Sequence, residues 1–178
     1  MKSNKMTKKK YIYLLIDMAC LAVNMDGFRY LYEKNKVLFE ADRNVIIKDM
    51  QFESVSHFWM ACAKRHLNIV KHLEPENDYI NDTDIDEISV HGAAASFGHI
   101  DVIEYLLNNF EDVNYQDSQG RTALNLTTYN GFLEVAQLLV ANGADINCLD
   151  DNDRSSFWVA CEKGYIEIAQ FFFLMDPK

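Results

Sequence analysis

The residues best suited to metal or acid–base chemistry are the five histidines and four cysteines of this 178-residue chain. Such side chains bind zinc when three or four of them converge, commonly through Cys-x-x-Cys or His-x-x-x-His pairs. No such pair occurs in the sequence, and the histidines are scattered along it, at His57, His66, His72, His91 and His99. We therefore predict neither a metal site nor a bound cofactor.

The sequence also lacks the patterns that are typical of enzymes. It contains no glycine-rich phosphate loop, no nucleophile elbow and no carboxylate pair on a recognisable scaffold motif. We predict that these residues hold no catalytic site.

The cysteines are spaced as packing residues rather than as a disulfide framework. Cys20, Cys62 and Cys161 each follow an alanine, and a buried free cysteine behaves as a small hydrophobic residue. Cys148 lies in a segment rich in turn-forming residues. We expect the first three to be buried and Cys148 to be the most exposed thiol.

Charge is unevenly distributed along the chain, whose net charge is −10. Residues 72–120 contain no Lys or Arg but many acidic residues, namely Glu74, Glu76, Asp78, Asp82, Asp84, Asp86, Glu87, Asp101, Glu104, Glu111, Asp112 and Asp117. Binding of nucleic acid depends on Lys and Arg that neutralise phosphates, so we expect this flank to repel nucleic acid and to attract a basic protein. A solvated face that serves only solubility explains the same composition.

The N-terminal residues allow two interpretations. Residues 1–10 hold five lysines and are expected to form a loose basic tail, and an apolar run follows at residues 11–23. This run either begins a degenerate capping repeat with an insertion, at residues 11–55, or belongs to a targeting signal. Asp17 and the short length disfavour insertion into a membrane. We therefore expect a cytoplasmic protein, or a nuclear one.

Four stretches of similar sequence recur at a spacing of 33 residues, at 56–62, 89–95, 122–128 and 155–161. A fixed period of this size is typical of a stacked array, in which each unit buries its apolar face against its neighbours. Each stretch opens with Ser or Thr, which cap helices well. Gly98, Gly131 and Gly164 follow at equivalent positions and are expected to separate two helices, whereas Arg65 takes this place in the first unit.

A second predicted helix in each unit carries apolar residues at helical spacing, for example Leu133, Val135, Ala136, Leu138 and Leu139. The segments 114–121 and 147–154 between units are rich in turn formers, which predicts projecting hairpin loops with exposed tips. The sequence thus predicts an all-α solenoid of stacked helix-turn-helix units with projecting hairpin loops.

The pattern resembles that of the ankyrin repeat family, most clearly in the third unit, at residues 120–124, 130–139 and 142–147. The resemblance covers residues 56–178 and divides them into repeats at 56–88, 89–121 and 122–154 and an incomplete repeat at 155–178. The family's Thr-Pro-Leu-His opening is nowhere complete. Its His position is occupied by Trp59, Gly92, Asn125 and Trp158.

The resemblance implies a non-catalytic protein–protein interaction module that binds a partner through its concave face and hairpin tips. The family's variable contact positions correspond here to Ile85, Asp86, Ser96, Phe97, Ser118, Gln119, Tyr129, Asn130, Asp151, Asn152, Glu162 and Lys163. Phe97 and Tyr129 are the expected anchors, because aromatic side chains bury a large area at little conformational cost. The alternative is a recruiting or regulatory segment of a larger enzyme or channel that continues beyond residue 178.

The C-terminal residues 169–178 end within the second predicted helix of the last unit. They leave Phe172 or Phe173 where a further unit would normally dock, and an uncovered phenylalanine forfeits about 1 to 3 kcal/mol. Self-association through this helix, a fold-back or a longer chain would cover the face.

Asn81, Asn114 and Asn147 share one hairpin position at the 33-residue spacing. The resemblance implies that an oxygenase can hydroxylate asparagine at this position. A hydrogen bond across the turn is the simpler role for the same residues.

Overall fold

The computed structural model describes residues 26, 27, 30, 57–73, 83, 84, 86–109 and 112–175. The helices named in this part of the chain are α4 (His57–Ala63), α5 (Leu67–Leu73), α6 (Val90–Ser96), α7 (Ile100–Asn109), α8 (Ala123–Asn130), α9 (Leu133–Ala141), α10 (Ser156–Lys163) and α11 (Ile166–Met175). The predicted tail at residues 1–10 and almost all of the predicted capping repeat at 11–55 lie outside the described residues. The choice between a cap and a targeting signal lies outside them as well.

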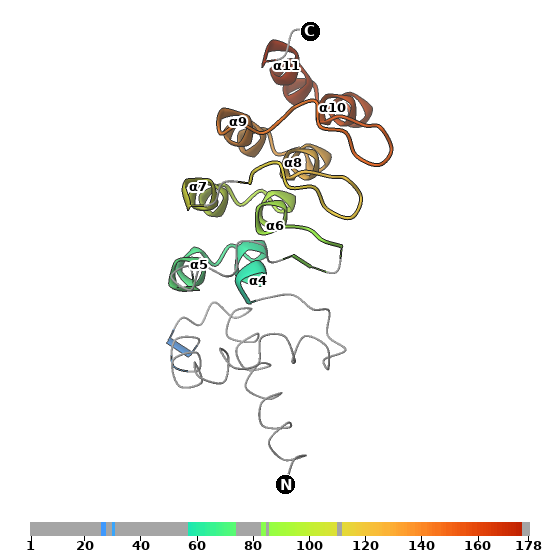
Figure 1. The fold of residues 1–178 in the computed structure, drawn as a ribbon. Coiled ribbons are helices and arrows are strands. Elements are labelled where there is room, and N and C mark those ends of the chain that lie inside the picture. The colour runs from blue at the N-terminus through green and yellow to red at the C-terminus, as the bar shows by residue number, and fades with distance from the viewer. Residues whose placement is uncertain are drawn as a thin grey trace.

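These helices form four consecutive pairs that are stacked in one row. Figure 1 shows α4, α6, α8 and α10, the first helices of the pairs, on one side, and the second helices on the other. The main contacts join the two helices of each pair and the corresponding helices of neighbouring pairs. The predicted all-α solenoid is confirmed.

The first helices α6, α8 and α10 begin directly after the predicted Ser and Thr residues. The hydroxyl groups of Ser89, Thr122 and Ser155 each accept a hydrogen bond from the backbone N–H three residues later. These bonds satisfy N–H groups that the start of a helix leaves without a partner. At the other end, Gly131 and Gly164 cap α8 and α10 in the left-handed conformation, which glycine adopts without strain.

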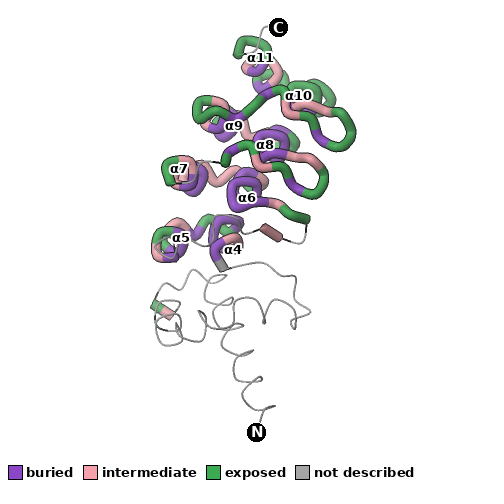
Figure 2. Tube along the Cα trace, in the orientation of Figure 1, coloured by how far each residue is buried: buried purple, intermediate pink, exposed green. Residues whose placement is uncertain are grey.

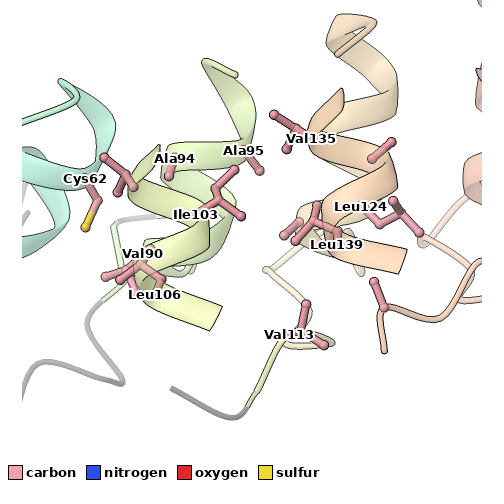
Figure 3. Packing of buried hydrophobic residues seen from close by; sticks show 14 of the residues in the cluster. Cys62, Val90, Ala94, Ala95, Ile103, Leu106, Val113, Leu124, Val135 and Leu139 are labelled. Carbon is pink, nitrogen blue, oxygen red and sulfur yellow. The ribbon is translucent and has the colours of Figure 1, made fainter. Parts of the chain in front are cut away.

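The core runs along the stack between the two rows of helices. Figure 2 shows that α6 and α8 are buried over most of their length, whereas the second helices have both buried and exposed residues, and Figure 3 shows some of the buried residues, including Ile103 and Leu139. In α6 the small residues Val90, Ala94 and Ala95 are fully buried, because this helix packs against both α4 and α8. Neighbouring pairs thus bury each other's apolar residues, and a cluster of buried hydrophobic residues extends through all four pairs.

In each of the last two helix pairs, one aromatic ring packs against a glycine of the preceding pair. A Cβ added to Gly98 would be 2.8 Å from the ring of Phe132, and one added to Gly131 would be 2.9 Å from the ring of Tyr165. Both glycines have positive φ, so the backbone conformation and the close approach of the ring each require glycine. At the equivalent Gly164, no described atom lies within 4 Å of an added Cβ.

The cysteines of the last pair differ from the prediction. Cys161 is exposed, Cys148 is half-buried and Cys62 is buried, whereas Cys20 lies outside the described residues. The expectations that Cys161 is buried and that Cys148 is the most exposed thiol are therefore wrong for the described cysteines. The position of Cys161 is buried only where the first helix of a further pair packs against it, and among the described helices only α11, the second helix of the same pair, follows α10.

Candidate protein-binding surface

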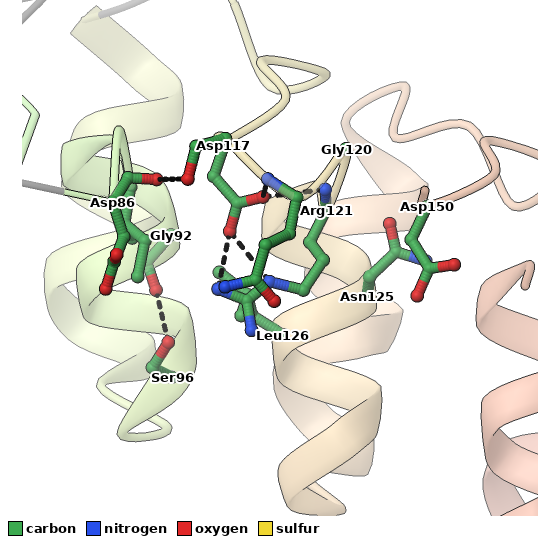
Figure 4. Close-up of polar contacts among 12 residues, drawn as sticks. Asp86, Gly92, Ser96, Asp117, Gly120, Arg121, Asn125, Leu126 and Asp150 are labelled. Carbon is green, nitrogen blue, oxygen red and sulfur yellow. Dashed lines mark hydrogen bonds and ion pairs between the residues drawn. The ribbon is translucent and has the colours of Figure 1, made fainter. Parts of the chain in front are cut away.

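Hairpin loops connect the second helix of one pair to the first helix of the next, and they project from the row of first helices (Figure 1). In the loop before α8, the buried carboxylate of Asp117 organises the turn (Figure 4). One of its oxygens accepts hydrogen bonds from the backbone N–H groups of Gln119 and Arg121, at 2.9 and 2.8 Å. The other oxygen binds the Arg121 guanidinium at 2.8 Å. These bonds hold the loop in one shape while its tip stays in solvent.

The loop before α10 repeats this arrangement. Asp150 is buried and accepts hydrogen bonds from the backbone of Asn152 and Arg154 and from the Arg154 guanidinium. Burial alone would raise the pKa of Asp150, but the hydrogen bonds from Arg154 and Asn152 outweigh it and lower the pKa below its usual value. Asp150 is therefore ionised at neutral pH. In the loop before α6, Asp84 accepts two equivalent hydrogen bonds from the backbone N–H groups of Asp86 and Ile88.

Neighbouring loops are joined through their backbones. Ser118 donates from its N–H and its hydroxyl to the carbonyl oxygen of Asp86, at 3.0 and 2.7 Å. One repeat later, the N–H of Asp151 donates to the carbonyl oxygen of Gln119 at 3.0 Å. A Cβ added to Gly120 would lie 2.7 Å from a carboxylate oxygen of Asp151, so glycine is needed for this approach. The hairpin tips thus form one continuous edge.

The structure brings the described tip residues of the sequence prediction together at this edge. These are Asp86, Ser118, Gln119, Asp151 and Asn152, and all five are exposed. Ile85 lies outside the described residues. Hydrogen bonds between backbone groups of neighbouring loops, from Ser118 to Asp86 and from Asp151 to Gln119, hold these tips in a fixed order.

The other predicted contact residues lie at the C-terminal ends of the first helices. Phe97 and Tyr129 expose 53% and 50% of their surface. Ser96 and Asn130 instead turn back onto their own helices, where each donates a hydrogen bond of 2.8 Å to the carbonyl oxygen four residues earlier. The two rings are therefore the large apolar groups exposed at the ends of α6 and α8.

Two lysines contact these rings, and the sequence prediction missed one of them. Lys163, which is exposed beside Glu162 at the end of α10, places its Nζ 3.9 Å from the centre of the Tyr129 ring. Lys64, directly after α4, places its Nζ 5.9 Å from the centre of the Phe97 ring. Lys64 stands 33 residues before Phe97, so extending the contact positions to the first repeat would have found it.

A family model described as ankyrin repeats, in three copies, matches residues 57–150 and, shifted by one repeat, residues 90–177. The chain belongs to the ankyrin repeat family. Ankyrin repeats are generally protein–protein interaction modules and are typically non-catalytic. No curated protein sequence matches the chain.

At the ankyrin His position, Asn125 and Trp59 form hydrogen bonds at or next to the boundary with the following repeat. Asn125 of α8 is buried, and its oxygen accepts hydrogen bonds from the N–H and the hydroxyl of Thr122, at 2.9 and 2.8 Å. Its amide donates to the hydroxyl of Ser156 on α10, at 3.1 Å. In α4, the indole N–H of Trp59 donates to the carbonyl oxygen of Ile88, at 2.7 Å. Asn125 therefore bonds to the following ankyrin repeat, and Trp59 bonds to the last residue of its own repeat, although neither is a histidine.

Of the three asparagines at the ankyrin hairpin position, Asn114 uses both ends of its side-chain amide. Its NH₂ group donates to the carbonyl oxygen of Gly143 at 3.1 Å, and its oxygen accepts from the N–H of Asp145 at 2.9 Å. Asn147 is exposed, and Asn81 lies outside the described residues. Asn114 thus bonds across the turn to the next repeat.

Within the residues that the structure describes, no three His, Cys, Asp or Glu side chains converge in a way that could hold a metal ion. His99 instead forms a hydrogen bond of 3.0 Å with the carbonyl oxygen of Ala63, and burial lowers its pKa. None of the described helices combines the length and the apolar character needed to cross a membrane.

Proposed function

We propose that the chain is a non-catalytic module that binds a partner protein across its concave face. This binding face consists of the hairpin tips and the C-terminal ends of the first helices. The observation that supports it most is the pair Phe97 and Tyr129, two half-exposed rings at the ends of the neighbouring helices α6 and α8. Exposed aromatic residues that become buried by a partner commonly supply a large share of the binding energy.

The charge at the hairpin tips favours a basic partner. Asp86 and Glu87 are exposed before α6, and Asp151 and Asp153 are exposed before α10. Opposite charge on a partner speeds its encounter with these tips, and salt screens the attraction. We expect association to slow as the salt concentration rises. The same charge disfavours nucleic acid, whose phosphates need Lys and Arg.

The double variant Phe97→Ala/Tyr129→Ala tests the binding face. Its affinity for a partner identified by pull-down and mass spectrometry is expected to fall by more than about 2 kcal/mol, which is typical of interface hot spots. Its thermal unfolding midpoint should stay close to that of the wild type. Phe173→Ala is the matched control, because it removes a similarly exposed ring from α11. Unchanged affinity in the double variant would place the site elsewhere.

The alternative proposal is a recruiting or regulatory ankyrin segment of a larger enzyme or channel that continues beyond residue 178. Both proposals use the same binding face, so binding data do not separate them. A catalytic or membrane-spanning pattern in the gene past Lys178 would support the segment, and an immediate stop codon would exclude it. For either case we propose a cytoplasmic or nuclear location, which cell fractionation tests.

A second candidate function is self-association through α10 and α11. These helices expose six large hydrophobic side chains, namely Phe157, Trp158, Ile166, Phe173, Leu174 and Met175. Together they expose an area on the order of 600 Å² per copy, so a symmetric dimer would bury roughly 1,200 Å², the lower end of stable interfaces. Of the two phenylalanines singled out in the sequence, Phe172 is buried and Phe173 is 64% exposed.

Light scattering over a range of protein concentrations tests this self-association. We expect the wild type to dimerise as its concentration rises, and the variant Phe173→Ser/Leu174→Ser to stay monomeric. Phe97→Ser serves as the control, since it removes an exposed ring from the binding face. A wild-type protein that stays monomeric at every concentration excludes the dimer.

Hydroxylation of Asn81, Asn114 or Asn147 is a further proposal that rests on the family resemblance. The two hydrogen bonds of the Asn114 side chain disfavour its access to an oxygenase. Hydroxylation of Asn114 would therefore require these two hydrogen bonds to break. An intact-mass measurement of native protein that shows no added oxygen would exclude the modification.

A further inference from the structure

Lys64 and Lys163 differ from the described cations that are held by acids. Arg65 binds Asp101 at 3.1 Å, and the arginines of the two hairpin loops bind their buried aspartates at 2.8 Å. Among the described residues, Lys64 and Lys163 contact an aromatic ring and no carboxylate. Their ammonium groups therefore remain able to pair with an acid from outside the chain.

The order of these groups along the binding face is lysine, ring, ring, lysine. Lys64 follows α4, Phe97 follows α6, Tyr129 lies at the end of α8 and Lys163 at the end of α10. Since these first helices are stacked in chain order (Figure 1), the two rings occupy the centre and the two ammonium groups the flanks.

The rings hold the lysines in place and keep the centre of the surface apolar. A lysine positioned over a ring has already lost part of its rotational freedom, so less is lost when an anion binds to it. His99 stacks on Phe97, with ring centres 5.9 Å apart and planes 20° apart. Because burial lowers its pKa, His99 supports this ring without adding a charge at neutral pH.

We propose that, within the binding function proposed above, this surface binds an extended segment of the partner that has an apolar centre and a carboxylate side chain on each flank. The apolar centre lies on Phe97 and Tyr129, and the carboxylates pair with Lys64 and Lys163. Basic residues elsewhere on the partner meet the acidic hairpin tips. The partner therefore carries two separate rows of charge, with acidic residues that face the two lysines and basic residues that face the hairpin tips.

The spacing of the two carboxylates follows from the stack. Neighbouring helices lie about 10 Å apart, so with lysine-to-ring distances of 5.9 and 3.9 Å the two ammonium groups are separated by at most roughly 20 Å. An extended chain crosses this distance in about six residues. The segment thus carries its two acidic residues up to about six positions apart, with apolar residues between them.

A random peptide library displayed on phage tests this segment. Selection against the wild-type chain is expected to enrich peptides with two Asp or Glu residues at about this spacing around an apolar centre. The variant Lys64→Gln/Lys163→Gln should bind the synthesised peptides about tenfold more weakly, since two partly exposed ion pairs are lost. Lys71→Gln is the matched control, because it removes a lysine that lies 5.4 Å from the ring of Tyr105, between the second helices. It should bind the peptides as the wild type does.

The outcomes separate this inference from the general function. Peptides that lose binding in Phe97→Ala/Tyr129→Ala but show no preference for acidic residues overturn the acidic segment and leave the binding face intact. Equal weakening by Lys71→Gln also overturns it, because the loss would then be a general effect of charge. Selected peptides that bind the Phe97→Ala/Tyr129→Ala variant normally overturn both proposals.

Discussion

The third and fourth helix pairs have equivalent sequence positions but different burial. Leu124 of α8 is fully buried, whereas Phe157, at the equivalent position of α10, is 38% exposed. Asn125 and Trp158, at the next position, are 3% and 45% exposed. Among the first helices, α8 packs against both α6 and α10, and α10 packs against α8 alone. Burial at these positions is therefore decided by the following pair and not by how apolar the residue itself is.

The largest expected difference between the two pairs is the cost of removing an apolar side chain. Leu124→Ala should lower the free energy of unfolding by about 3 to 4 kcal/mol, because it leaves a cavity between two neighbours. Phe157→Ala should cost about 1 kcal/mol, since much of that ring already contacts water. Urea titrations followed by circular dichroism measure both values. Equal costs would mean that α10 is covered in solution.

Acid should lower the stability of the protein through His91 of α6, which occupies the position equivalent to Leu124 and Phe157. Burial lowers the pKa of His91 from 6.5 to about 4, against the opposing effect of Asp112. Between these two values the unfolded chain binds more protons than the folded one, so stability is complete above pH 6.5 and falls as the pH drops towards 4. The loss should be about 3 kcal/mol.

The variant His91→Leu is the control for this pH dependence. It introduces the residue type found at the equivalent position of α8. Most of the change in stability between pH 6.5 and 4 should then disappear. Residues 100–178 contain no histidine, so hydrogen exchange at pH 5 should increase in α6 before it increases in α8 or α10. A uniform increase along the stack would contradict this assignment.

The equivalent glycines Gly131 and Gly164 test the same comparison of the third and fourth pairs, with a smaller expected difference in stability. Gly131→Ala combines a strained positive φ with displacement of the Tyr165 ring, so it should cost about 2 to 3 kcal/mol. Gly164→Ala meets no described atom within 4 Å, and the strain alone should cost about 1 kcal/mol. Thermal unfolding of the two variants separates the cost of strain from that of ring contact.

The smallest expected effect concerns thiol reactivity. In a Cys20→Ser background, Cys161 should react with a thiol reagent first, because it is the exposed cysteine of the described part. Cys148 should follow, since partial burial and the nearby Asp145 raise its pKa. Cys62 should react only on unfolding. Fast labelling of Cys62 in the native protein would show that the contact between α4 and α6 opens readily.

Much of the fold was predictable because its signals are local and repeated. Ser89, Thr122 and Ser155 cap their helices through bonds to a backbone group three residues away, and such bonds depend on nearby sequence alone. Arg65, which replaces glycine at the predicted break, has a φ of 61°. The position in the repeat thus decides the backbone conformation even where the residue is unfavourable for it.

The candidate site was predictable in part. Phe97, Tyr129 and the described tip residues, chosen from the repeat positions, are exposed, and their contact with a partner stays a prediction. Lys64 was missed, and so was the contact of each lysine with a ring, because these contacts join side chains from different repeats. The bond from Asn125 to Ser156 could not be foreseen either, since it depends on how closely α8 and α10 approach each other.

By itself, the sequence determined the 33-residue period. It also determined the start and end of the first helices and the aspartates that shape the hairpin loops, because these depend on bonds between residues close in the chain. The tertiary structure decided which equivalent residues are buried, as with Leu124 and Phe157, and which charges meet which rings. These outcomes depend on the surface that a neighbouring helix pair supplies. Equivalent residues therefore differ in burial wherever their neighbours differ.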